Sequence, residues 1–148
     1  MSVDLRIPKG EVVVDCRLTE PREELEGARL FLNLSSPHHS GPQTIGEYLA
    51  EGVRFVPMRT NGEHPLLLNL RRLMWLRERT RENPPAGIPL FLVFADQTEM
   101  EVELSEVLPE FHARPIDFFN GPSPFLCFFQ DGQRLHVHRR WIARVEGI

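Results

Sequence analysis

Cysteine is scarce in this sequence, and the two residues present do not form a close-spaced pair. Cys16 and Cys127 each lie in an apolar, strand-like run, so we expect buried thiols in a reducing compartment, with a disulfide as the open alternative. The longest apolar run, 90–95, is far too short to cross a bilayer. The first ten residues lack the apolar segment of a secretory signal. We therefore predict a cytoplasmic protein that does not enter a membrane.

Lysine is almost absent, because arginine supplies all but one of the 17 basic residues. The formal net charge of -4 gives the chain no overall attraction to nucleic acid or to an anionic membrane. The arginine preference fits either a GC-rich genome or bidentate anion recognition, and we favour the first. With 41% hydrophobic and 26% charged residues, the composition is typical of a soluble globular protein.

Motifs of the common catalytic classes are also missing. Neither cysteine lies in a glycine-flanked turn, and the sequence holds no Gly-x-Ser-x-Gly elbow and no glycine-rich phosphate loop. We therefore predict a non-enzymatic protein that uses no cofactor.

The sequence does contain an internal similarity between two stretches, 47–76 and 117–145. The offset is 70 up to Gly62, which aligns with Gly132, and 69 after this turn, where Arg71 aligns with Arg140. The positions that keep their chemistry are mostly apolar or turn residues, which indicates a repeated fold rather than a repeated reaction. We expect two units of about 70 residues, each small enough to be marginal alone, that share a core or pack tightly.

Each unit is predicted to contain strand, strand, short helix, hairpin, bend and strand. Thr44 and Glu47 form a capping box for the first short helix, and the Asn-Gly and Asp-Gly turns at 61–62 and 131–132 are typical of hairpins. Alternation of apolar and polar residues indicates the strands. Those of the first unit are 11–18, 28–34, 53–59, 66–70 and 73–77, and those of the second are 90–95, 99–104, 125–129, 135–138 and 141–145.

A proline-rich stretch, 79–89, carries no periodicity and is interpreted as the linker between the units. The predicted domains are therefore 1–84 and 85–148. Five short, strongly bent strands are too few for an open sheet that buries both faces, so we expect each unit to close on itself. The predicted fold class is mainly β with short helices, arranged as two tandem small β-barrels related by internal duplication.

The ends of the units, LLNLRRLMWLRE and LHVHRRWIARVE, resemble the last two strands of Sm-like and SH3-like small barrels. The strand at 55–58 is similar to one in small β-barrel domains of uncharacterised bacterial proteins. The resemblance implies tandem small barrels and carries no activity with it. The Arg-Gly pair common in the Sm family is absent, since Arg72 follows Arg71 and Trp141 follows Arg140, so an RNA-binding ring is not implied.

Arginines gather around the bend of each unit. The first group is Arg71, Arg72, Arg77, Arg79 and Arg81, and the second is Arg134, Arg139, Arg140 and Arg144. Segment 71–82 has a net charge of +3, whereas segment 96–110 has a net charge of -6. We favour complementary surfaces, within the molecule or with a partner, and keep RNA or phosphorylated-ligand binding at the paired arginine bends as the alternative.

Histidines are the remaining candidates for chemistry. His136 and His138 alternate on one strand, so their rings would project about 7 Å apart on one face, a spacing that can chelate zinc or iron. His38, His39, His64 and His112 lie in loops and could complete such a site. No carboxylate or cysteine lies at ligand spacing, so we favour a solvent-facing strand edge and predict no metal.

The sequence therefore predicts a protein-protein interaction or scaffold module that acts through exposed strand edges and charged faces, with a protein partner or self-association. Consecutive phenylalanines in a small barrel usually face the core on one side and a partner on the other, so Phe128 or Phe129 is expected at a contact. The candidate binding residues are Arg71, Arg72, Arg139, Arg140, Arg144, Phe128 and Phe129.

Overall fold

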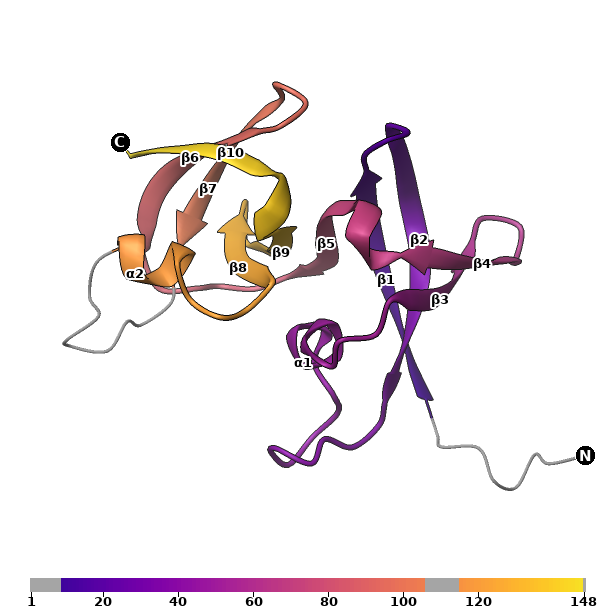
Figure 1. Ribbon diagram of the computed structural model, residues 1–148. Helices are drawn as coiled ribbons and strands as arrows, with labels where there is room; N and C mark the ends of the chain where they lie inside the picture. The colour runs from indigo at the N-terminus through magenta and orange to yellow at the C-terminus, as the bar shows by residue number, and fades with distance from the viewer. Residues whose placement is uncertain (1–8, 106–114, 148) are drawn as a thin grey trace, which may run out of the picture.

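The computed structural model describes residues 9–105 and 115–147, which form one ten-stranded antiparallel sheet and a few short helices (Figure 1). The strands are β1 (Lys9–Leu18), β2 (Glu23–Asn33), β3 (Phe55–Thr60), β4 (His64–Asn69), β5 (Leu73–Arg81), β6 (Ile88–Phe94), β7 (Glu99–Leu104), β8 (Phe125–Gln130), β9 (Gln133–His138) and β10 (Ile142–Gly147). The helices are α1 (Ile45–Ala50) and α2 (Pro115–Phe119), with single 3-10 turns η2 (Leu70–Arg72) and η4 (Arg139–Trp141). The predicted mainly β class is confirmed.

Strand order is the same in the two halves of the sheet. The full order is β10-β6-β7-β8-β9-β5-β1-β2-β3-β4, so each half runs last, first, second, third, fourth strand. The register agrees too: the pairing of β5 with β1 skips Met74, and the pairing of β10 with β6 skips Ala143, at an offset of 69. The sheet is not closed, so two separate barrels and their origin by duplication remain predictions.

Local sequence signals explain the short elements. The side chain of Thr44 accepts a hydrogen bond from the N–H of Glu47, and the Glu47 carboxylate accepts one from the N–H of Thr44, which confirms the capping box. Both predicted hairpins form, with Gly62 at φ +82° and Gly132 at φ +78° in the region that favours glycine. The predicted linker is shorter than expected, because β5 extends to Arg81 and β6 begins at Ile88.

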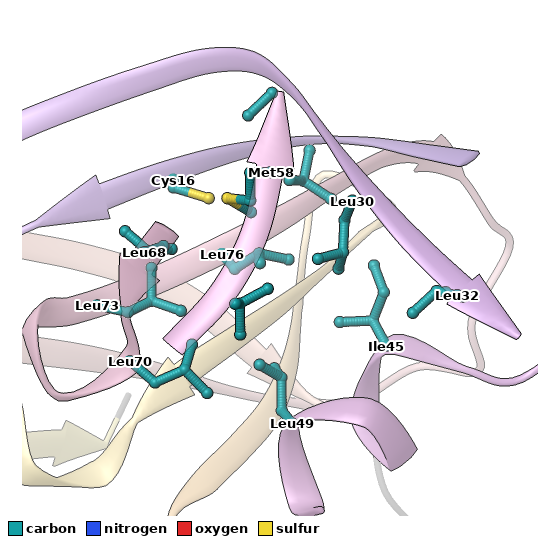
Figure 2. Close-up of a cluster of buried hydrophobic side chains, with 13 residues drawn as sticks. Cys16, Leu30, Leu32, Ile45, Leu49, Met58, Leu68, Leu70, Leu73 and Leu76 are labelled. Carbon is teal, nitrogen blue, oxygen red and sulfur yellow. The ribbon is translucent and has the colours of Figure 1, made fainter. Parts of the chain in front are cut away.

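Two separate clusters of buried side chains form the core, and one strand belongs to both. Leu73 and Leu76 of β5 pack into the first cluster, whereas Met74 and Trp75 of the same strand pack into the second. All four side chains are buried. Figure 2 shows the first cluster, where Leu73 and Leu76 lie among side chains from β2, β3, β4 and α1. The halves therefore share a strand, as Figure 1 shows by the position of β5 between them.

Polar contacts across the shared strand join the halves. β5 pairs with β9, and the Arg77 guanidinium donates to the side-chain oxygen of Gln130 over 2.8 Å. The buried Arg17 of β1 forms an ion pair with Asp96, at the turn between β6 and β7, over 3.1 Å. Asp96 of the acidic segment is thus paired with Arg17, and not with an arginine of segment 71–82, so the predicted complementarity between these two segments stays a prediction. Among the described residues, no helix has the length and apolarity needed to cross a membrane.

Candidate functional site

The two arginine bends lie side by side, although they are far apart in the sequence. The Trp141 indole N–H donates to the Arg71 carbonyl oxygen over 3.0 Å, which ties η4 to η2. A pocket of about 280 Å³ opens between the two turns. Its lining residues are Asn69, Arg71, Arg72, Arg140 and Trp141. Three of the seven predicted binding residues therefore line one pocket.

The turns that present these arginines are built in the same way. In η2 the Asn69 side chain accepts a hydrogen bond from the N–H of Arg71, and in η4 the His138 ring accepts one from the N–H of Arg140. These caps hold both arginines at the surface, where their side chains are exposed. Arg140 also lies over the Trp141 ring, 5.3 Å from the centroid, in a cation-π contact.

The electrostatic potential at the bends is positive. The pKa of His138 is lowered from its ordinary value, first because the ring is half-buried and then because Arg140, Arg139 and Arg71 lie nearby. Arg72 forms an ion pair with Glu20 over 2.8 Å. Neither Arg71 nor Arg140 forms an ion pair with any described residue. Two cationic side chains of this pocket are thus available to an anion.

The other predicted arginines lie elsewhere. Arg139 precedes Arg140 in η4 and contributes to the potential at His138 without lining the pocket. Arg144 lies on β10, where its side chain is 61% exposed and forms an ion pair with Glu146 over 2.8 Å. Of the five predicted arginines, three therefore line the pocket and two, Arg139 and Arg144, do not.

The phenylalanines expected at a contact separate into a core residue and a surface residue. Phe128 is fully buried and packs in the second cluster against Phe118 and Phe119 of α2, so it is corrected to a core residue. Phe129 is partly exposed, and the guanidinium of Arg134 lies 5.1 Å from its ring centroid. The next residue of β8, Gln130, accepts a hydrogen bond from Arg77 of β5, so Phe129 lies close to the junction of the halves.

The two histidines of β9 do not share the expected environment. His136 is buried, and its Nε2 lies 2.7 Å from the Glu78 carboxylate of β5, so the expected solvent-facing edge is wrong for this residue. His138 is half-buried against Phe125. Within residues 9–105 and 115–147, no group of three or more histidine, cysteine, aspartate or glutamate side chains could hold a metal ion. His112 lies outside this part of the chain.

No disulfide joins Cys16 and Cys127, so the alternative that the sequence left open is wrong. Cys16 is buried, and this burial, together with the charge of Asp15, raises the pKa of its thiol to about 12. The thiolate is the reactive form of cysteine, so the raised pKa lowers the reactivity of Cys16 at neutral pH.

A second candidate surface is the outer face of the β3–β4 hairpin, which differs from the equivalent face of β8–β9. The outer face of β8–β9 is covered by the first half: Phe125 packs against the first core cluster, and His136 lies near Gly46 of α1 and Glu78 of β5. The equivalent outer face of β3–β4 is exposed to solvent. It carries the apolar residues Phe55, Pro57, Pro65 and Leu67, of which Phe55 is 55% and Leu67 is 68% exposed.

The edge of this second surface has unpaired backbone groups. β4 is the last strand of the sheet and pairs only with β3 among the described strands. Pro57 lies opposite Leu67 and has no N–H to donate, so these two residues form a non-hydrogen-bonded pair of the antiparallel ladder. In such a pair the backbone N–H and C=O groups of each residue point away from the neighbouring strand. The N–H and C=O of Leu67 therefore point outward from β4, where they can bond another strand.

Comparison with known proteins found no matching protein family, no similar curated protein and no similar solved structure. The functional proposals therefore depend on the geometry of this chain. Sequence analysis did not single out Phe55, Leu67, Asn69 or Trp141. The one signal for the apolar hairpin face was the alternation of Phe55 and Pro57, but the sequence does not tell which hairpin the other half covers.

Proposed function

We propose that the chain is a non-enzymatic protein-protein interaction module that binds its partner at the edge and the outer face of the β3–β4 hairpin. The partner is another protein or a second copy of the chain, and it adds a strand to β4. In this proposal each half acts as a small barrel-like unit of the Sm-like or SH3-like type, and the molecule serves as a scaffold.

The observation that carries this proposal is the difference between the two equivalent hairpins. β9 pairs with β5, and the outer face of β8–β9 is covered by α1 and the first core cluster. Among the described residues, no strand pairs with the outer edge of β4, and Phe55 and Leu67 of its hairpin are more than half exposed. Exposed apolar surface beside an unpaired edge favours strand addition.

The internal junction also indicates the geometry of the missing strand. In β5, Trp75 lies opposite Val137 and Leu76 lies opposite His136. At the offset of 69, the corresponding positions of β4 are Leu68 and Leu67. An antiparallel strand added to β4 would therefore place one of its residues directly opposite Leu67. An apolar side chain at that residue would pack beside Leu67 and exclude water from it.

A charge placed on the hairpin face tests this proposal. In Leu67→Lys the exposed position keeps the fold intact, whereas the lysine must lose water when a partner covers it. The matched control is Ile88→Lys, because Ile88 is an apolar strand residue that is 43% exposed in the other half. Sedimentation velocity over a concentration series measures self-association, and affinity capture with cross-linking in the native host detects other partners.

The proposal predicts that the wild-type chain and Ile88→Lys form the same complex and that Leu67→Lys loses it. Circular dichroism and thermal unfolding verify that both variants are folded. A complex that is equally strong in Leu67→Lys would contradict binding at β4. A wild-type chain that stays monomeric and captures no partner would contradict the interaction module itself.

A further inference from the structure

The pocket between η2 and η4 lies apart from the hairpin face of β3–β4 and has a different chemical character. It is lined by three arginines, one asparagine and one tryptophan. We propose that this pocket binds the phosphate group of a small phosphorylated molecule, through Arg71 and Arg140 with Arg72 as a third, partly neutralised cation. This site is independent of the interaction proposed for β4.

The number of charges favours a doubly charged group. Arg71 and Arg140 form no ion pair with described residues, and the positive charge of Arg72 is partly balanced by Glu20. The pocket therefore has a surplus of about two positive charges, which matches the charge of a phosphomonoester near neutral pH. Guanidinium groups bind phosphate oxygens in pairs of parallel hydrogen bonds, which gives direction as well as charge.

The pocket is also organised before any ligand arrives. The indole N–H of Trp141 fixes the backbone of Arg71, and the Asn69 and His138 side chains hold the turns that carry Arg71 and Arg140. The ring of Trp141 lies under the guanidinium of Arg140 and restricts its motion. Ordering of side chains is part of the cost of binding, so the contact with Trp141 lowers this cost for Arg140, whereas for Arg71 the backbone alone is fixed.

Size and overall charge favour a small ligand over a nucleic acid. The volume of about 280 Å³ lies just below the range for small-molecule pockets, roughly 300–1,000 Å³. The chain carries a net charge of -4, and the second half exposes Glu99, Glu101 and Glu103 on β7. A polyanion would meet this repulsion along its length, whereas a single phosphate group would meet only the local positive potential.

Calorimetric titration of the full chain with inorganic pyrophosphate at low ionic strength measures the site. Arg71→Gln and Arg140→Gln should each weaken binding about tenfold or more, the loss expected for hydrogen bonds to a charged group. Arg144→Gln is the matched control, because this exposed arginine lies outside the pocket and should leave the affinity unchanged. Glu20→Gln should strengthen binding about two- to fivefold, since it releases Arg72 from an exposed ion pair.

A second readout follows the histidine beside the pocket. The pKa of His138 is lowered by burial and by the charges of Arg140, Arg139 and Arg71, so a bound anion should raise it toward its ordinary value. Proton NMR titration of the ring with and without pyrophosphate detects this change. In Arg140→Gln the same change should require about tenfold more pyrophosphate.

Three results would overturn the proposal. The first is no saturable binding of pyrophosphate by the wild-type chain at millimolar concentration. The second is an equal loss of affinity in Arg144→Gln and Arg140→Gln, which would indicate general charge attraction. The third is binding of mixed-sequence single-stranded RNA that is tighter than that of pyrophosphate and lost in Arg71→Gln, which would make the pocket a nucleic-acid site.

Discussion

Met74 offers the most direct test of how the halves are joined. It is the residue of β5 that the pairing with β1 skips, and its side chain is fully buried in the second core cluster. Its counterpart on β10 is Ala143, which is exposed. Met74→Ala therefore removes a buried side chain that β5 has and that β10 lacks at the equivalent position. The variant loses buried apolar contacts and leaves a cavity in the second half.

The expected cost of Met74→Ala is about 2–5 kcal/mol of unfolding free energy, the range for a buried methionine truncated to alanine. For a chain of this size each kcal/mol lowers Tm by roughly 2–4 °C, so the loss should exceed about 4 °C. Urea unfolding followed by tryptophan fluorescence and by far-UV circular dichroism measures it. The two curves should coincide, because β5 belongs to both core clusters.

The control is Ala143→Met, which adds the same side chain at the exposed counterpart and should change stability by less than about 0.5 kcal/mol. Similar small effects of both substitutions would refute the assignment of β5 to the second core. Two well-separated unfolding transitions would refute the sharing of one strand between the halves.

Two further predictions concern a turn and a helix start. Gly132→Val should destabilise the chain more than Gly62→Val: both glycines have positive φ, but a Cβ at 132 would lie 2.9 Å from the Glu82 carbonyl oxygen, whereas at 62 it would meet only a side chain at 3.4 Å. Equal Tm values of the two variants would contradict this. The pKa of Glu47 is lowered to about 2, chiefly by a hydrogen bond from Ser36, so its contribution to stability is complete above its ordinary pKa of 4.5 and is lost as the pH falls from there toward 2. Glu47→Gln should remove this part of the pH dependence of Tm, and an unchanged pH profile would show that the hydrogen bonds of Glu47 do not stabilise the fold.

Signals that act over a few residues predicted much of the fold. The capping box at Thr44 and the glycines at 62 and 132 each depend on neighbours within four residues, and the structure has the expected helix and hairpins. The repeat offset of 70 and 69 also matches the positions of α1 and α2, and of η2 and η4.

The shared strand was harder to predict, because four consecutive residues from Leu73 to Leu76 are buried. Alternation marks a strand with one buried face, whereas β5 is covered on both faces and shows a continuous apolar run. Its pairing with β9 joins residues about 60 positions apart, and no local pattern encodes such a contact. The sequence therefore suggested two closed barrels instead of a sheet that continues from one half into the other.

The candidate site shows the same division between local and distant information. Arg71, Arg72 and Arg140 were predicted as binding residues from their position at equivalent bends, but their meeting around one pocket follows from the pairing of β5 with β9. Phe128 or Phe129 was expected at a contact because alternate residues of a strand face opposite sides, and Phe128 occupies the side that faces the core.

Amide hydrogen exchange at two equivalent positions tests the central claim that β9 is an internal strand and β4 is an open edge. The backbone N–H of His136 faces β5 and should exchange slowly, whereas the N–H of its counterpart Leu67 faces away from β3 and should exchange nearly as fast as in an unstructured peptide. Mass spectrometry or NMR at low protein concentration resolves the two sites. Equal and strong protection of Leu67 and His136 would contradict the open edge and, with it, the proposed mode of partner binding.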